Sequence, residues 1–188
     1  VLDKLFIFVP ESGSLFGVLT STGVVKNIVL TNLVHNGQGA VIVSGGIGTV
    51  ENVYIHCSTI KNDGDANNAT SMLCARGILG ALRIKNCYVQ IDESAVSGKT
   101  GVYGIGGVRL GSGVLNNVYC VGANDGVWKS NQSWNMGDVE NGTDKYASYA
   151  TCDAMKAANI SVTEENGWDI SFWTTDADGL PVPKTLKN

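Results

Sequence analysis

The sequence predicts an all-β fold, a parallel β-helix (solenoid) of about four to five coils, and three observations predict it. Four nine-residue segments repeat one pattern around an asparagine, and a glycine-rich strand precedes each of them. Glycine supplies 24 of the 188 residues and prolines only three. Such a glycine content, without a collagen-like period, indicates tight corners in a regular structure.

The repeat occupies residues 24–32, 49–57, 83–91 and 114–122, with an asparagine at each fourth place. The second residue before the asparagine and the first and third after it are apolar. Because side chains alternate between the faces of a strand, these positions share one interior only if the chain bends at the asparagine. Asparagine tolerates left-handed backbone angles, so we expect four stacked corners whose amides form a ladder: Asn27, Asn52, Asn86 and Asn117.

Glycine-rich second strands are expected at 15–19, 40–43, 73–79 and 102–105. Successive corner asparagines are 25, 34 and 31 residues apart, and the two longer intervals contain the polar loops 61–68 and 92–99. Together with residues 36–38 and the segment after Gly122, these insertions should leave the coil at one corner and form a continuous rim. Insertions gathered on one face commonly form the binding surface of repeat proteins.

We predict one domain, with β-helix coils over 1–122 and a long loop, a short helix and a capping segment over 123–188. The helix is expected at 152–158, with Thr151 as its N-cap and Asp153 in its first turn. The chain has no initiator methionine or signal peptide at its start, which suggests a mature or excised piece of a longer protein.

Composition excludes several classes of protein. A net charge of −4 with 16% charged residues argues against nucleic-acid binding driven by phosphate charge, and 44% apolar residues argue against disorder. No apolar run approaches the roughly 18 residues of a membrane-spanning helix, so we expect no membrane insertion. The five cysteines form no Cys-x-x-Cys motif and match no zinc spacing, so we expect small buried side chains.

The rim combines acids and amides with tryptophans, which suits the hydroxyls and the apolar faces of sugars. The predicted binding residues are Asp63, Asp65, Asn67, Asp92, Glu93, Trp128 and Trp134. In a competing interpretation, the two tryptophans pack over the end of the last coil. Tyr54, Tyr88 and Tyr119 should form an outward stack, which either stabilises the strands or offers a platform for sugars or a partner.

The sequence contains few indications of a metal site or a catalytic site. Asp63, Asp65 and Asn67 alternate like the first half of a calcium loop, but Asn68 and Cys74 replace its glycine and its final glutamate. We expect an ordinary turn and no cofactor, with calcium there as the alternative. Loop acids could meet the separation that glycoside cleavage needs, but nothing holds them in place, so no catalytic residue is assigned. His56 is expected to be a solvated surface histidine.

Leu15-Phe16-Gly17, followed by Gly23 to Ile28, resembles the repeat of right-handed parallel β-helix proteins with GLUG-type repeats. These occur on bacterial surface and secreted proteins, including the non-catalytic regions of IgA-cleaving peptidases. The Trp168…Trp173…Gly179-Leu180-Pro181 segment resembles the piece that closes such coils at their end. The resemblance implies a right-handed coil and a scaffold for binding or display, and it brings no catalytic residues.

Two classes of function therefore stay open. One is a non-catalytic surface or fibre module for adhesion or display, such as a bacterial adhesin or a subunit of a phage fibre, that binds a glycan or a surface protein. The other is a polysaccharide lyase or glycoside hydrolase on the same fold. Either function places the chain outside the cell, on a cell surface or on a virion. We also expect the N-terminal end of the coil to be covered by preceding residues or by a partner chain.

Overall fold

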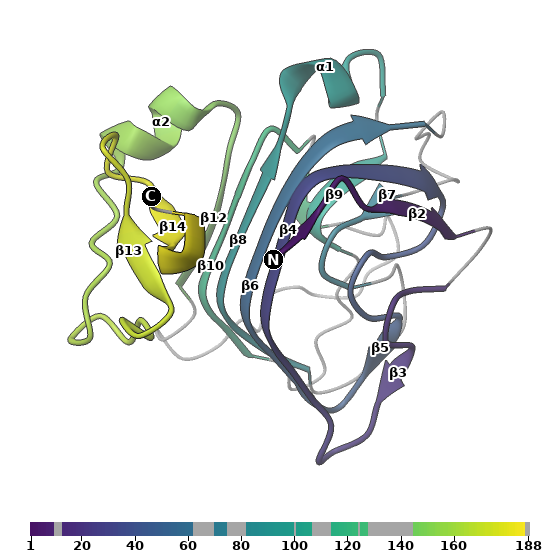
Figure 1. Cartoon of the computed structure of the whole chain (residues 1–188), viewed down its shortest axis with the longest axis horizontal. Helices are drawn as coiled ribbons and strands as arrows, with labels where there is room; N and C mark the ends of the chain where they lie inside the picture. The colour runs from purple at the N-terminus through teal and green to yellow at the C-terminus, as the bar shows by residue number, and fades with distance from the viewer. Residues whose placement is uncertain are drawn as a thin grey trace, which may run out of the picture.

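The computed structural model describes residues 1–9, 13–61, 70–74, 82–99, 101–106, 114–123, 125–127 and 145–186. The chain is a parallel β-solenoid of about four turns, as predicted (Figure 1). Within the described residues the main sheet has seven strands in the order β1-β4-β6-β8-β10-β12, with β2 also beside β4, and every pair is parallel. Their bounds are β1 Leu2–Asp3, β2 Phe6–Val9, β4 Val24–Gly37, β6 Thr49–Ile60, β8 Arg83–Ile91, β10 Val114–Val121 and β12 Lys145–Tyr149.

The opposite wall of the solenoid is made of shorter strands. One small sheet pairs β3 (Val18–Leu19) with β5 (Gly45–Gly46), and another orders β11 (Asp125–Val127), β9 (Val102–Gly106) and β7 (Thr70–Ser71). Glycine is required where coils touch closely here. Gly106 has φ +125°, and a Cβ atom there would lie 1.9 Å from the carbonyl oxygen of Cys74.

The four corner asparagines have φ between 52° and 59°, so the predicted left-handed bends are confirmed. Residues on both sides of them pair in register from coil to coil, which stacks the corners. Asn52 Nδ2 donates to Asn27 Oδ1 at 3.0 Å, and Asn117 Nδ2 donates to Asn86 Oδ1 at 3.1 Å. The amides thus bond as two pairs.

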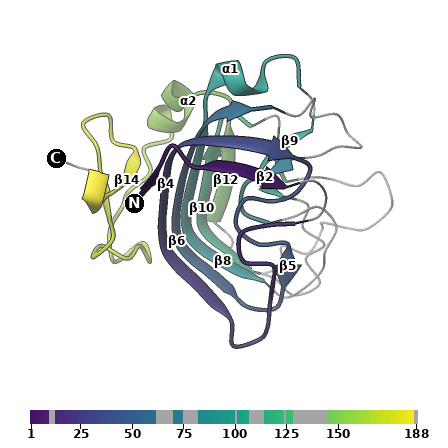
Figure 2. The ribbon, with the colours of Figure 1, turned by 45° about the vertical axis from the view of Figure 1, so that its right-hand side comes forward.

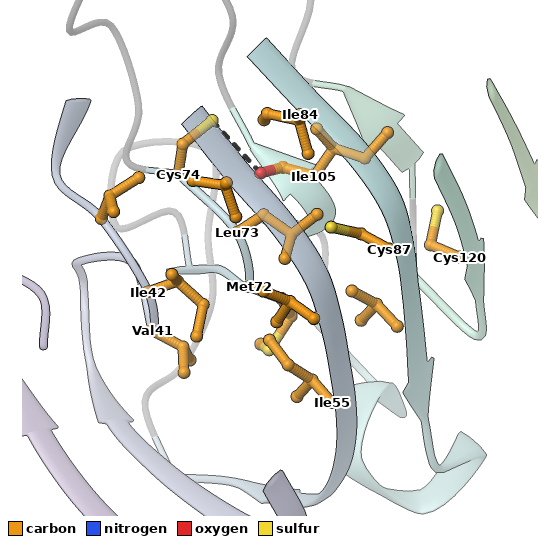
Figure 3. Close-up of a cluster of buried hydrophobic side chains, with 14 of the residues drawn as sticks. Val41, Ile42, Ile55, Met72, Leu73, Cys74, Ile84, Cys87, Ile105 and Cys120 are labelled. Atoms are coloured by element: carbon orange, nitrogen blue, oxygen red, sulfur yellow. Dashed lines mark hydrogen bonds between the residues drawn. The ribbon is translucent and has the colours of Figure 1, made fainter. Parts of the chain in front are cut away.

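Aliphatic side chains and cysteines fill the interior of the coil (Figure 3). All five cysteines are free thiols. Four are buried, as expected, namely Cys57, Cys74, Cys87 and Cys120, whereas Cys152 departs from the expectation because it is only partly buried. Burial raises the pKa of the first three of these thiols to about 12. These cysteines act as small apolar side chains in the coil.

The C-terminal segment comprises α2 (Cys152–Ala157), the hairpin β13 (Trp173–Thr175) and β14 (Pro181–Pro183), and the 3-10 helix η2 (Lys184–Leu186). Thr151 caps α2 by accepting a 3.1 Å bond from the Ala154 amide, which confirms the predicted helix start. The sequence resemblance suggested that this segment closes the end of the coil, but it lies against the outer face of the main sheet (Figure 2). The tyrosines of that face explain the difference, because they provide a large apolar surface for it.

Tyr54 and Tyr88 point outward from the coil, as predicted, yet Tyr88 is only 1% exposed. The C-terminal Trp168 and Trp173 pack over this row, with Tyr54 6.4 Å from Trp173 and Tyr119 stacked 5.9 Å from Trp168. The tyrosines therefore stabilise the fold, and the alternative of an open aromatic platform is wrong.

Three local expectations need revision. The loop 92–99 contains a short helix, α1 (Glu93–Val96), because Ala95 enters the core. The predicted loop at 36–38 is partly strand, since β4 continues to Gly37 beside β2. After Gly122, β11 and β12 stack on the preceding coil although the asparagine pattern has ended.

Candidate functional site

The predicted rim is described only in part. Asp63, Asp65, Asn67, Trp128 and Trp134 lie outside the described residues. Asp92 and Glu93 stand at the start of α1, directly after β8. The described part of the candidate site is therefore built around these two acids.

Asp92 is bonded to a histidine on the neighbouring coil. His56 Nε2 lies 2.9 Å from Asp92 Oδ1, and both side chains are partly exposed. The backbone amide of Asp92 also donates to the carbonyl oxygen of Cys57 at 3.0 Å. His56 was expected to be a solvated surface histidine. It is partly exposed, and the pairing of β8 with β6 brings Asp92 beside it.

His56 belongs to a polar row on the outer face of the main sheet. Gln90 pairs with His56 on the next strand, as the shared repeat position predicts. On the other side, Thr31 and Asn32 fill a bulge in β4 opposite His56. We call the group Asp3, Thr31, Asn32, His56, Gln90, Asp92 and Glu93 the polar edge.

Asp3 begins the polar edge on β1, and no pattern in the sequence pointed to its role. Its Oδ1 accepts hydrogen bonds from Thr31 Oγ1 at 2.7 Å and from Asn32 Nδ2 at 2.8 Å. These bonds hold the pKa of Asp3 below its ordinary value, chiefly through the Thr31 hydroxyl. Asp3 is therefore a carboxylate at neutral pH, and it stays exposed to solvent.

Glu93 differs from Asp92 because it is exposed, with α1 held in place beneath it. Ala95 is buried and Val96 packs against the core, so the turn is anchored from below. The polar edge thus presents carboxylates, amides, a hydroxyl and an imidazole on rigid elements. This set can exchange hydrogen bonds with a hydroxyl-rich or amide-rich ligand.

Metal binding and catalysis find no further support in the described geometry. Among the residues that the structure describes, no cluster of three or more histidine, cysteine, aspartate or glutamate side chains could hold a metal ion. The predicted calcium loop lies outside those residues. Asp92 faces His56, whereas cleavage of a glycosidic bond requires two carboxyl groups that flank that bond.

The other histidine, His35, is a structural feature that sequence reasoning did not single out. It is 0% exposed, and neither ring nitrogen has a hydrogen-bond partner. It stacks in register between Ile7 and Ile60, so it occupies an apolar row. Burial lowers its pKa to about 4. A neutral ring at this place fills space and leaves no group for a ligand.

Comparison of the chain with known protein families, with characterised proteins and with solved structures finds no match. In the described part of the chain, no helix is both long and apolar enough to cross a membrane.

Proposed function

We propose that the chain is a non-catalytic β-helix module of a surface or fibre protein that binds a glycan or a protein through the edge where its loops leave the coil. The observation that carries this proposal is the rigid presentation of Asp92 and Glu93. Asp92 is held by His56 and α1 by buried Ala95, so the acids need little ordering when a ligand binds.

The contacts of the other polar and aromatic groups support the proposal, because they are made within the fold. The corner asparagines bond to one another and to the C-terminal segment, and the outward tyrosines lie beneath that segment. These groups serve the scaffold. The polar edge, by contrast, stays partly exposed and lies on strands and a helix that pack on the core.

The proposal extends to the class of protein. The GLUG-type resemblance of Leu15-Phe16-Gly17 and Gly23 to Ile28 supports a repeat scaffold of bacterial surface and secreted proteins. A location on a cell surface, in the extracellular medium or on a virion follows from it. The proposed rim would also include the loop residues Asp63, Asp65, Asn67, Trp128 and Trp134.

Screening the chain on a glycan array, with a reducing-end assay on every hit, tests the function. For a glycan that binds, Asp92→Asn and Glu93→Gln should each weaken affinity about 5- to 30-fold, as expected for charge-assisted hydrogen bonds. Glu164→Gln is the matched control, because Glu164 is exposed on the C-terminal segment. Equal weakening by all three variants would count against the polar edge, and release of reducing ends would establish the enzymatic alternative.

A further inference from the structure

Two phenylalanine side chains stand on the outer surface of β2, just past a bend of the coil. Phe6 and Phe8 are 53% and 63% exposed, whereas Ile7 between them is buried, so both rings point away from the coil. Lys4 and Asn32 form the bend, with φ 55° and 51°. Single exposed apolar residues are common on proteins, but two adjacent large rings in one row indicate a contact surface.

Strand register extends this surface over two further strands. Phe6 pairs with Val34 and Phe8 with Asn36 on β4, and Val34 pairs in turn with Thr59 on β6. The side chains next to the phenylalanines are partly or fully exposed. We call the following group the aromatic face: Phe6, Phe8, Val34, Asn36, Thr59 and Lys61.

The aromatic face points across the axis along which the coils stack. Val34 has β2 on one side and β6 on the other, and it is still partly exposed. A neighbouring strand therefore covers the side of such a position and leaves its outward direction open. The described C-terminal segment packs over the tyrosine row, on the other side of the bend.

Lys61 brings hydrogen-bond donors onto the aromatic face. Its Nζ lies 5.2 Å from the centroid of the Phe6 ring, and its side chain is exposed. An ammonium group carries three donors. Asn36, which is partly exposed beside Phe8, adds an amide that both donates and accepts.

The polar edge borders the same face and supplies acceptors. Asp3 stands at the bend, three residues before Phe6. Asp92 reaches the border through its contact with His56, which lies three residues before Thr59 on β6. A ligand on the face therefore meets carboxylate acceptors at the border and an ammonium donor over the rings.

We propose that the aromatic face binds a neutral glycan chain, whose sugar rings stack on Phe6 and Phe8 and whose hydroxyls bond to Lys61 and to the polar edge. This inference rests on the proposed function and selects a glycan as its ligand. The apolar side of a sugar ring fits an exposed aromatic ring. Because strand residues two places apart are about 7 Å from each other, the two phenylalanines can hold neighbouring units of one chain.

The mixed charges of the surface favour a neutral ligand. A hydroxyl group both donates and accepts, so it can satisfy the carboxylates and the ammonium together. The acids Asp3 and Asp92 would repel an anionic glycan or an anionic membrane surface, and Lys61 would repel a polycation.

Titration of six-unit oligosaccharides into the isotope-labelled chain, followed by NMR, tests the inference. The neutral probes are the hexamers of xylose, mannose and N-acetylglucosamine, and the charged probes are the hexamers of glucosamine and galacturonic acid. At least one neutral hexamer should bind, with shift changes centred on residues 5–8, 34–36 and 59–61. Each charged hexamer should bind more weakly than the best neutral one.

Variants of the face make the test specific. Phe6→Ala and Phe8→Ala should each weaken binding of that neutral hexamer about tenfold or more, because a stacking ring is lost. Phe6→Tyr keeps the ring and should bind within about threefold of the unmodified chain. Lys61→Met keeps an apolar side chain, loses the donors and should weaken binding about threefold or more. Phe16→Ala is the matched control, because Phe16 is 45% exposed and lies outside the face.

Three results would overturn the inference: no neutral hexamer binds, a charged hexamer binds more tightly than every neutral one, or Phe6→Ala and Phe8→Ala bind as the unmodified chain does. If Asp92→Asn weakens hexamer binding and the phenylalanine variants do not, this inference fails and the proposed function stands. Release of reducing ends from a hexamer whose binding the phenylalanine variants weaken would overturn the proposed function alone.

Discussion

The inner and the outer faces of the main sheet are packed in different ways. Inside the coil, aliphatic side chains and cysteines repeat at fixed positions and meet their equivalents on the next strand. Outside, Tyr54 and Tyr88 meet Trp168 and Trp173 from a segment about 80 to 120 residues further along the chain. The inner layer is built from the same contacts repeated between neighbouring coils, whereas the outer layer depends on one segment that is distant in the sequence.

Asparagine corners join the two layers. Asn52 donates one amide hydrogen to Asn27 and the other to Asp169 Oδ2 at 2.7 Å, and its Oδ1 accepts from Trp173 Nε1 at 3.2 Å. Asn117 donates to the carbonyl oxygen of Asn166 at 2.9 Å. The asparagine that permits the backbone bend therefore also attaches the outer layer to the coil. The two layers should therefore unfold together.

The largest expected effect comes from Trp173→Ala. It removes the largest fully buried side chain of the outer layer and the donor to Asn52, so we expect a loss of about 3–5 kcal/mol in the free energy of unfolding. Ile170→Ala, on the exposed surface of the same segment, should change it by less than about 0.5 kcal/mol. Denaturant unfolding followed by tryptophan fluorescence and by circular dichroism measures both. Two separate transitions in the unmodified chain would contradict the coupling of the layers.

Acid should weaken the inner layer through His35. Its pKa is about 4 when folded and 6.5 as its ordinary value, so the unfolded chain binds more protons between these values. The contribution of neutral His35 is thus fully present above pH 6.5 and is lost as pH falls to about 4. We expect about 3 kcal/mol over this window, measured by denaturant unfolding at a series of pH values.

The variant His35→Leu should remove that pH dependence and leave any dependence below pH 4 in place. The latter belongs to carboxylates such as Asp169, whose pKa is lowered by hydrogen bonds from the Ser171 hydroxyl and from Asn52. If the slope between pH 4 and 6.5 persists in His35→Leu, another group must be responsible.

A smaller effect is expected at the corner Asn117. Asn117→Gly keeps the positive φ but leaves Asn86 Oδ1 and the Asn166 carbonyl without their donor, which should cost about 1–3 kcal/mol. Asn117→Ala should cost about 1–2 kcal/mol more, because alanine disfavours the left-handed bend. Asn159→Gly is the control, since Asn159 has φ 50° at an exposed site. In thermal melts the melting temperature should fall most for Asn117→Ala, less for Asn117→Gly and least for Asn159→Gly.

The smallest expected effect concerns the reactivity of the cysteine thiols. Four cysteines are buried in the coil, and Cys152 at the start of α2 is partly exposed. A thiol reagent should modify one thiol per folded chain and five in denaturant, and Cys152→Ser should abolish the reaction of the folded chain. Burial also raises the pKa of Cys152, so its reaction should accelerate as pH rises above neutrality. Fast reaction of a second thiol would show that the inner layer opens.

The coil and its corners could be predicted from sequence because their causes are local and repeated. Four asparagines with the same apolar neighbours specify a bend that each coil makes for itself. The start of α2 was predictable for the same reason, since Thr151 directly precedes the helix and caps the amide of Ala154, three residues further along. The outward direction of Tyr54 and Tyr88 followed from strand parity, and their burial did not.

Only the tertiary structure decided what covers the outer face and which groups meet at the polar edge. The C-terminal segment attaches through Asp169 and Trp173 to Asn52, contacts that no repeat pattern encodes. Asp92 reaches His56 because it directly follows β8, whose pairing with β6 sets Gln90 opposite His56. A sequence pattern predicts the direction of a side chain from its own strand. Which residues that side chain contacts depends on where segments distant in the sequence are placed by the fold.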